Sequence, residues 1–271
     1  MEKIGIGFIT CDREDFLSKS IKSFQKFFPE DAKNIVIVND GKKLEHNWTG
    51  YHHIEHKKNK GVGKSKNDAF RYLLDRGCTH IFIIEDDIIA KGDKNPFEEY
   101  IRVSKETGLQ HMMFGYHGPA NKNGVSGGTP TPRLVVDYDN DTKVALNLHC
   151  VGAFCYYSRK CLKEVGLMDK NYLNAFEHVD HSYMIAKAHM IPNYWWWPDI
   201  SNSYEYLDEI QCSEHSSSIR PRADWQENIQ TAAEYFFNKH GYRPAWSNYV
   251  PDINQRELFS RLKSIKQSYG A

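Results

Sequence analysis

The amino-acid sequence predicts an α/β fold, in which helices flank a mixed, mainly parallel sheet. Over the first hundred residues, short apolar segments alternate with amphipathic helical segments. This β–α–β order is typical of parallel sheets covered by helices. Of the 271 residues, 40% are hydrophobic and 26% are charged. This composition is ordinary for a soluble globular protein, and the length allows one large domain or two small ones.

The first half of the chain is expected to hold four strands and two helices. The strands are short apolar segments, of which the third is weaker because it is polar. The helices carry apolar side chains at near-helical spacing, and the second ends at Gly77. The expected strands are residues 4–10, 34–40, 51–56 and 80–87, and the expected helices are residues 13–28 and 63–77.

The second half begins with a loop over residues 115–132 that is rich in Gly, Pro and Asn. Strands with a turn at Asn140 and Asp141 follow within residues 133–158. Helices are expected at residues 159–166, 176–190, 225–241 and 254–269. We divide the chain into two halves of one domain, residues 1–105 and 106–250, and a C-terminal amphipathic helix in 251–271.

Charge and cysteine content exclude several classes of protein. The 35 basic and 35 acidic residues give a net charge of zero, which does not indicate a global polyanion-binding surface. The six cysteines form no Cys-x-x-Cys pair, so a zinc ribbon is not expected. No apolar run is long enough for a membrane span or a signal peptide. We therefore expect a reduced, cytoplasmic protein.

The segment GVGKS at residues 61–65 is similar to the end of a phosphate-binding P-loop. A complete P-loop would place its first glycine five residues before Gly63, where this chain has Lys58. The preceding strand is also short and polar. A P-loop enzyme and a simple helix start with solvated lysines both remain as alternatives for this segment.

Six segments in this order resemble the GT-A nucleotide-sugar glycosyltransferases, particularly glycosyltransferase family 2. The resemblance covers residues 4 to about 220. The segments are FITCDREDFLSKSIKSF, VIVNDG, NKGVGKSKNDAF, FIIEDDI, VGAFCYYSRKCLKEVGLMD and NAFEHVDHSYMI. The resemblance implies a GT-A fold in which residues 1–105 bind the nucleotide sugar and residues 106–250 bind the acceptor.

The resemblance implies a nucleotide site at the ends of the first strands. Asp40 matches the acid that contacts the base, and Lys64 at a helix start suits a phosphate together with free backbone N–H groups. The implied nucleotide-binding residues are Thr10, Asp12, Arg13, Asp40, Asn59, Gly61, Lys64, Asn67, Glu85 and Asp86.

Three acids at residues 85–87 fall where the family has its DxD motif, although the first acid here is glutamate. A nucleotide diphosphate leaves readily only when its charge is neutralised, and a divalent cation held by carboxylates does this. The resemblance assigns Asp87 to Mn²⁺ or Mg²⁺, with His215 as a second ligand by position. Ser216 and Arg220, or Arg222, are expected to contact the diphosphate.

The resemblance also implies a donor-sugar pocket and a catalytic base. Gly152 and Ala153 would leave space for the donor sugar. The family's base is a carboxylate at the start of a late helix, but this chain has histidine at that position. Glu177, His178 and Asp180 all remain candidates for the base. The tryptophans at 195–197 stack on a sugar or lie in the core, and we expect at least one in the core.

The sequence therefore predicts a metal-dependent glycosyltransferase with a nucleotide-sugar donor, UDP being the expected nucleotide, and inversion implied by the family. The expected acceptor is a surface glycan, as in polysaccharide biosynthesis, before a modified DNA base as in phage enzymes. A phage enzyme would act in the host cytoplasm. The basic, amphipathic C-terminal helix also suggests a peripheral contact with the inner face of a membrane. A P-loop-type enzyme and a non-catalytic sugar-nucleotide-binding module remain as alternatives, and the oligomeric state is not predicted.

Overall fold

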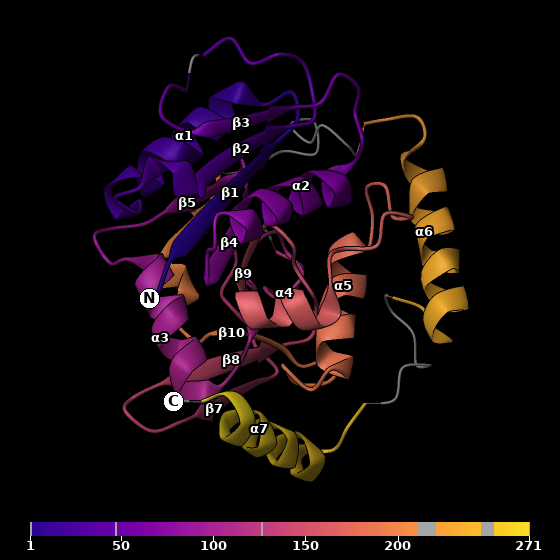
Figure 1. The fold of residues 1–271 in the computed structure, drawn as a ribbon. Coiled ribbons are helices and arrows are strands. Elements are labelled where there is room, and N and C mark those ends of the chain that lie inside the picture. Colours follow the sequence, from indigo (N-terminus) through magenta and orange to yellow (C-terminus); the bar gives the residue numbers. More distant parts are fainter. Residues whose placement is uncertain (1, 47, 126, 211–220, 245–251, 271) are drawn as a thin grey trace.

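The computed structural model describes residues 2–46, 48–125, 127–210, 221–244 and 252–270 (Figure 1). Its centre is a six-stranded sheet in the order β3-β2-β1-β4-β9-β6. The four parallel strands are β1 (Ile4–Thr10), β2 (Ile35–Asn39), β3 (His52–Glu55) and β4 (His80–Glu85). The two later strands, β9 (Phe154–Ser158) and β6 (His111–Met113), close the sheet by antiparallel pairing. The predicted mixed, mainly parallel sheet is confirmed.

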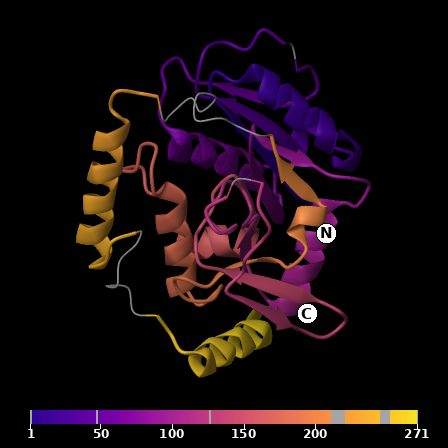
Figure 2. The same ribbon diagram turned by 180° about the vertical axis from the view of Figure 1, so that it is seen from behind.

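Two helices of the first half lie on opposite faces of this sheet (Figures 1 and 2). The chain runs outward from β1 through α1 (Glu14–Phe24) to β2 and β3. It then returns through α2 (Val62–Asp75) to β4 on the other side of β1. Because such crossovers are right-handed, the reversal of direction places the helices on opposite faces. The reversal also opens a crevice beyond the ends of β1 and β4, where open α/β sheets bind ligands.

The sequence prediction omits one helix and several short strands. The helix α3 (Pro96–Thr107) begins at the capping residue Asn95 and packs Phe97 and Tyr100 into the core. A three-stranded antiparallel sheet contains β7 (Leu134–Asp137), β8 (Lys143–Asn147) and β10 (Trp197–Ile200). A separate two-stranded sheet contains β5 (Ile88–Ala90), which packs against α1, and β11 (Leu207–Glu209). The predicted turn joins β7 to β8, where Asn140 and Asp141 both have a φ of 56°.

The boundary drawn between residues 105 and 106 falls inside α3, and strands from both halves share the main sheet. After β9 come α4 (Arg159–Val165) and α5 (Glu177–Lys187). The helix α6 (Trp225–His240) then runs beside α5 at the outside of the molecule, as both views show (Figures 1 and 2).

The last helix, α7 (Gln255–Tyr269), packs against α3. Its apolar residues Leu258, Leu262 and Ile265 are buried there, whereas Phe259 is exposed. The predicted apolar face is thus largely covered by the protein itself. No helix in the described part of the chain is long and apolar enough to cross a membrane.

Candidate active site

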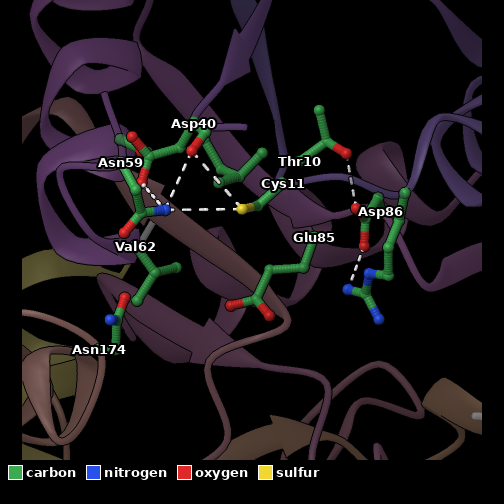
Figure 3. A pocket seen from close by; sticks show the side chains of 11 residues that line it. Thr10, Cys11, Asp40, Asn59, Val62, Glu85, Asp86 and Asn174 are labelled. Atoms are coloured by element: carbon green, nitrogen blue, oxygen red, sulfur yellow. Dashed lines mark hydrogen bonds and ion pairs between the residues drawn. The ribbon is translucent and has the colours of Figure 1, made fainter. Parts of the chain in front are cut away.

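A pocket opens beyond the carboxyl ends of β1, β2 and β4 and beside the first turn of α2 (Figure 3). Six of the predicted nucleotide-binding residues line it. They are Thr10, Arg13, Asp40, Asn59, Glu85 and Asp86, which stand beside Cys11, Val62 and Asn174. Residues from five separate segments of the chain therefore meet where the fold places its crevice.

Asp86 is the most buried acid of the pocket. Its side chain accepts a hydrogen bond from the Thr10 hydroxyl at 2.6 Å and is paired with the Arg13 guanidinium. Burial raises the pKa of Asp86 to about 7, with Asp87 acting in the same direction and Arg13 against it. A buried carboxylate at a strand end is costly unless a cation neutralises it, so this position favours a positively charged partner.

Asp87 faces a different set of partners. One oxygen lies 3.2 Å from Arg13 and the other 3.5 Å from His117 Nε2. Burial raises the pKa of Asp87, but His117 and Arg13 outweigh it and hold the value below its ordinary range. His117 also lies 3.7 Å from Glu209, which pairs with Lys122 at 2.7 Å. No sequence motif marks His117 or Glu209, because only the folding of the long loop and of β11 brings them to Asp87.

The acids fit a divalent cation only in part. Asp86 and Asp87 supply the oxygen ligands that Mg²⁺ and Mn²⁺ prefer. Within the described ranges, however, no group of three or more His, Cys, Asp or Glu side chains is arranged to hold a metal ion. Arg13 already contacts both carboxylates, so a metal ion on Asp87 would share or displace this contact. The remaining ligands would have to come from the donor phosphates or from residues outside the described ranges.

Asp40 is held entirely by the protein. One carboxylate oxygen contacts His56 Nδ1 at 2.6 Å and the backbone N–H of Lys60 at 2.7 Å. The other accepts from Asn59 Nδ2 at 2.9 Å and from the N–H of Gly61 at 2.8 Å. These four contacts fill the acceptor sites of a carboxylate. In this conformation Asp40 shapes the pocket wall and has no acceptor site left for a nucleotide base.

The same contacts explain the P-loop-like segment. A P-loop cradles phosphate with backbone N–H groups, but here the N–H groups of Lys60 and Gly61 bind Asp40. Gly61 has a φ of 90°, and a Cβ there would lie 2.1 Å from the Leu173 carbonyl oxygen. A Cβ on Gly63 would lie 3.1 Å from the Glu177 side chain, which is closer than an ordinary van der Waals contact. The glycines serve close packing of α2 on the segment before α5.

Lys66 contacts an acid of the pocket, Glu85, whereas the predicted Lys64 does not, and neither lysine is among the residues that line the pocket. Lys64 pairs with Asp68 one turn along α2 and does not line the pocket. Lys66 is fully buried, with Nζ 2.7 Å from Glu85 and 3.6 Å from Glu177. Burial lowers the pKa of Lys66, but the two carboxylates outweigh it and raise the value well above normal. Asn67 lies away from the pocket and binds the backbone N–H and carbonyl of Met168.

Glu177 and His178 begin α5 next to this lysine. The Glu177 carboxylate lies 3.0 Å from His178 Nδ1. Burial raises the pKa of Glu177, but His178 and Lys66 outweigh it and lower the pKa to about 2. Glu177 is therefore ionised and orients the imidazole, leaving His178 Nε2 for another partner. A Cβ on Gly152 would lie 2.7 Å from the His178 ring, so this glycine makes room for the histidine.

Asp180 has a structural partner set. It contacts His240 Nε2 at 2.6 Å, Lys239 Nζ at 2.9 Å and the Tyr172 hydroxyl at 3.2 Å. Burial raises the pKa of Asp180, but His240 and Lys239 outweigh it and lower the pKa. These contacts join α5 to α6, so Asp180 holds the two helices together, and Glu177 and His178 remain the candidates for the base.

The other predicted residues lie at the rim of the pocket, in the strand segment next to β4, or outside the described residues. Asp12 is exposed and accepts the N–H of Lys42 at 2.7 Å, and buried Ala153 accepts the N–H of Glu85 at 2.7 Å. His215, Ser216 and Arg220 lie outside the described residues. Arg222, the alternative to Arg220, contacts the Asn59 side chain at 3.1 Å and thus lies at the rim of the pocket.

Comparisons with known proteins agree with this geometry. No protein-family model matches the sequence. Over 247 residues the chain is 27% identical to an uncharacterised glycosyltransferase of Acanthamoeba polyphaga mimivirus. The aligned region covers 86% of this chain and 91% of the viral protein. Among solved structures it is similar to S. aureus TarS in complex with UDP, with a TM-score of 0.54 and 14% identity. That match covers 97% of this chain and 70% of the TarS chain.

A second solved structure, GalNAc-T7 with UDP, GalNAc and Mn²⁺, has a TM-score of 0.55 and 12% identity. The match covers 99% of this chain and 54% of that chain. Both structures are GT-A glycosyltransferases, and this likeness confirms the predicted GT-A fold. Together with the viral relative, they confirm the predicted resemblance and the prediction of a glycosyltransferase.

Proposed function

We propose that the protein transfers a sugar from a UDP-linked donor to a hydroxyl of a glycan, with a divalent cation and with inversion. The observation that carries this proposal is the pair of buried acids at the end of β4, together with Lys66, which joins the neighbouring Glu85 to the Glu177–His178 pair. UDP is supported by TarS, solved with UDP and with UDP-GlcNAc, and by GalNAc-T7 with UDP.

In this proposal Asp87 would hold the cation, which would supply positive charge for the departing diphosphate. Mn²⁺ in the GalNAc-T7 structure supports this choice of cofactor. Arg13 and Lys66 add positive charge close by, and Arg222 stands at the rim. His215 remains the proposed second protein ligand, with Ser216 and Arg220 on the diphosphate.

His178 is the proposed base, oriented by Glu177. Its ring is partly exposed, and its Nδ1 is held by the carboxylate. A histidine with one nitrogen fixed by a carboxylate is well suited to take a proton at the other. Glu177 itself is buried against Lys66, which makes it a weaker base in this setting. Attack by a base-activated hydroxyl directly on the donor sugar accounts for the proposed inversion.

The test is release of UDP from UDP-sugars in the presence of glycan acceptors and Mn²⁺ or Mg²⁺. Asp87→Asn should lower the rate by about 100-fold or more, because several kcal/mol of charge stabilisation are lost. Asp93→Asn is the matched control, since Asp93 is an exposed acid that pairs only with Lys26 among described residues. Full activity of Asp87→Asn would remove Asp87 from the metal site. Donor binding without any UDP release would indicate a non-catalytic module.

A further inference from the structure

A second cavity of about 290 Å³ lies between the start of α5, the start of α6 and the segment before β10. Its walls carry five large aromatic side chains, Phe176, Tyr194, Trp195, Trp197 and Trp225. Asn174 lines both this cavity and the pocket at the ends of β1 and β4, so the two are neighbours. His178, the proposed base, lines this cavity.

The described residues that line this aromatic cavity include no lysine, arginine, aspartate or glutamate. Its lining residues carry two imidazoles, the Asn174 amide, the indole N–H groups, the Cys150 thiol and the Tyr194 hydroxyl, which donates to the Pro244 carbonyl. Asn174 is 7% exposed, and its Nδ2 has no hydrogen-bond partner within the described part of the chain. A buried, unpartnered N–H group costs about 1–3 kcal/mol, which a ligand oxygen would recover.

Two of the aromatic walls are held in a strained backbone conformation. Phe176 has a φ of 61° and Trp195 has a φ of 69°, both in the left-handed region that bulky side chains avoid. Each such residue costs of order 1–3 kcal/mol, and such residues cluster at functional sites. Trp196 is buried in the core and Trp197 is buried while lining the cavity, whereas Trp195 lines the cavity and is only partly buried.

We propose that the aromatic cavity binds a neutral sugar ring of the acceptor, which rests on the function proposed above. Aromatic faces pack on the apolar face of a sugar, while the Asn174 amide donates to a ring hydroxyl. The acceptor oxygen next to His178 Nε2 then attacks the anomeric carbon of the donor. Its proton passes to His178, the bond from that carbon to the phosphate oxygen breaks, and UDP leaves with the electron pair.

The absence of cationic side chains among the described lining residues argues against a DNA acceptor. A duplex is held mainly by lysine and arginine contacts to its phosphates. A flipped base would also stack between aromatic side chains, but its flanking phosphates would need such cations nearby. The neutral lining of the aromatic cavity and the zero net charge therefore favour an uncharged sugar.

The test uses tryptophan fluorescence of the full chain with UDP and Mn²⁺ present, titrated with methyl glycosides of neutral hexoses. Saturable quenching by at least one glycoside is expected. Trp225→Ala should weaken this binding about tenfold, and Trp225→Phe, which keeps an aromatic face, should retain most of it. Binding of a UDP-sugar should be the same in both variants, because Trp225 does not line the donor pocket. This binding is measured as the rise in the melting temperature of the protein.

The outcomes separate this inference from the function on which it rests. If the UDP-sugar binds but no glycoside quenches the fluorescence, the aromatic cavity is not a sugar site and the inference is wrong. Quenching by a hydroxymethylated oligonucleotide in place of the glycosides would overturn it in favour of DNA. If no UDP-sugar binds the wild-type protein, the proposed function fails first. Equal glycoside binding by Trp225→Ala and wild type would also contradict the inference.

Discussion

Lys66 connects the two acidic parts of the candidate site. Its Nζ lies between Glu85 at the end of β4 and Glu177 at the start of α5, and it donates to the Gly152 carbonyl at 3.0 Å. A lysine is rarely buried unless its charge is paired. Lys66 therefore links the donor pocket to the proposed base, and its loss would leave the buried Glu177 with only its His178 contact.

We predict that Lys66→Met lowers the free energy of unfolding by about 3 kcal/mol, because breaking a buried ion pair leaves its partner charged. For a chain of this size the melting temperature should fall by about 6 °C or more. Lys64→Met is the matched control on the same helix. Its exposed pair with Asp68 should contribute about 1 kcal/mol or less. Equal losses in the two variants, measured by thermal unfolding, would contradict the role given to Lys66.

For individual residues, the sequence predicted the kind of chemistry better than it predicted which side chains take part in it. Motif position selected Lys64, yet the helical period turns Lys64 outward and Lys66 inward. Asp40 was expected to meet a nucleotide base, but backbone N–H groups from the next loop occupy it. His117 and Glu209 had no motif, since only the tertiary fold brings them to Asp87.

Among the elements, α5 and α6 together build one wall of the aromatic cavity. Asp180 on α5 receives His240 and Lys239 from the last turn of α6. Tyr183 of α5 stacks on Phe236 at a centroid distance of 6.1 Å. Trp225 and Ile229 of α6 then face the cavity. Docking of α6 is thus what completes the proposed acceptor site.

We predict that Asp180→Asn loosens α6, because hydrogen bonds to a buried charge contribute about 1.5–3 kcal/mol. Amide hydrogen exchange should speed up along residues 225–240 while the strands of the main sheet stay protected. Glu234→Gln changes an exposed carboxylate of the same helix and should leave exchange unaltered. Unchanged exchange of α6 in Asp180→Asn would show that other contacts hold this helix.

Long elements with strong periodicity could be predicted, whereas short ones could not. The strands β1, β2 and β4 and the helices α2, α6 and α7 match their expected ranges to within two residues. The strands β5, β6 and β11 have three residues each and too little pattern to recognise. The helix α3 had recognisable signals that we did not use, namely Asn95 as a cap, Pro96 after it and Gly108 at its end.

For the molecule as a whole, the order of the strands determines where the candidate site lies. The reversal between β1 and β4 gathers the strand ends that carry Thr10, Asp40 and Asp86. The second half adds α5 with its proposed base and the aromatic cavity beyond it. Donor pocket, base and cavity follow one another across the molecule, which is the arrangement that transfer between two bound sugars requires.

The most direct test of this account is a melting-temperature screen of UDP-, GDP-, CMP- and dTDP-sugars and ATP, each without a metal ion, with Mn²⁺ and with Mg²⁺. A ligand at about 100 times its dissociation constant stabilises the fold by roughly 2.7 kcal/mol, which is about 5 °C or more here. The account predicts such a rise with a UDP-sugar and Mn²⁺ together. A rise with ATP and Mg²⁺ alone would contradict it and would restore a nucleotide triphosphate as the ligand of the GVGKS segment.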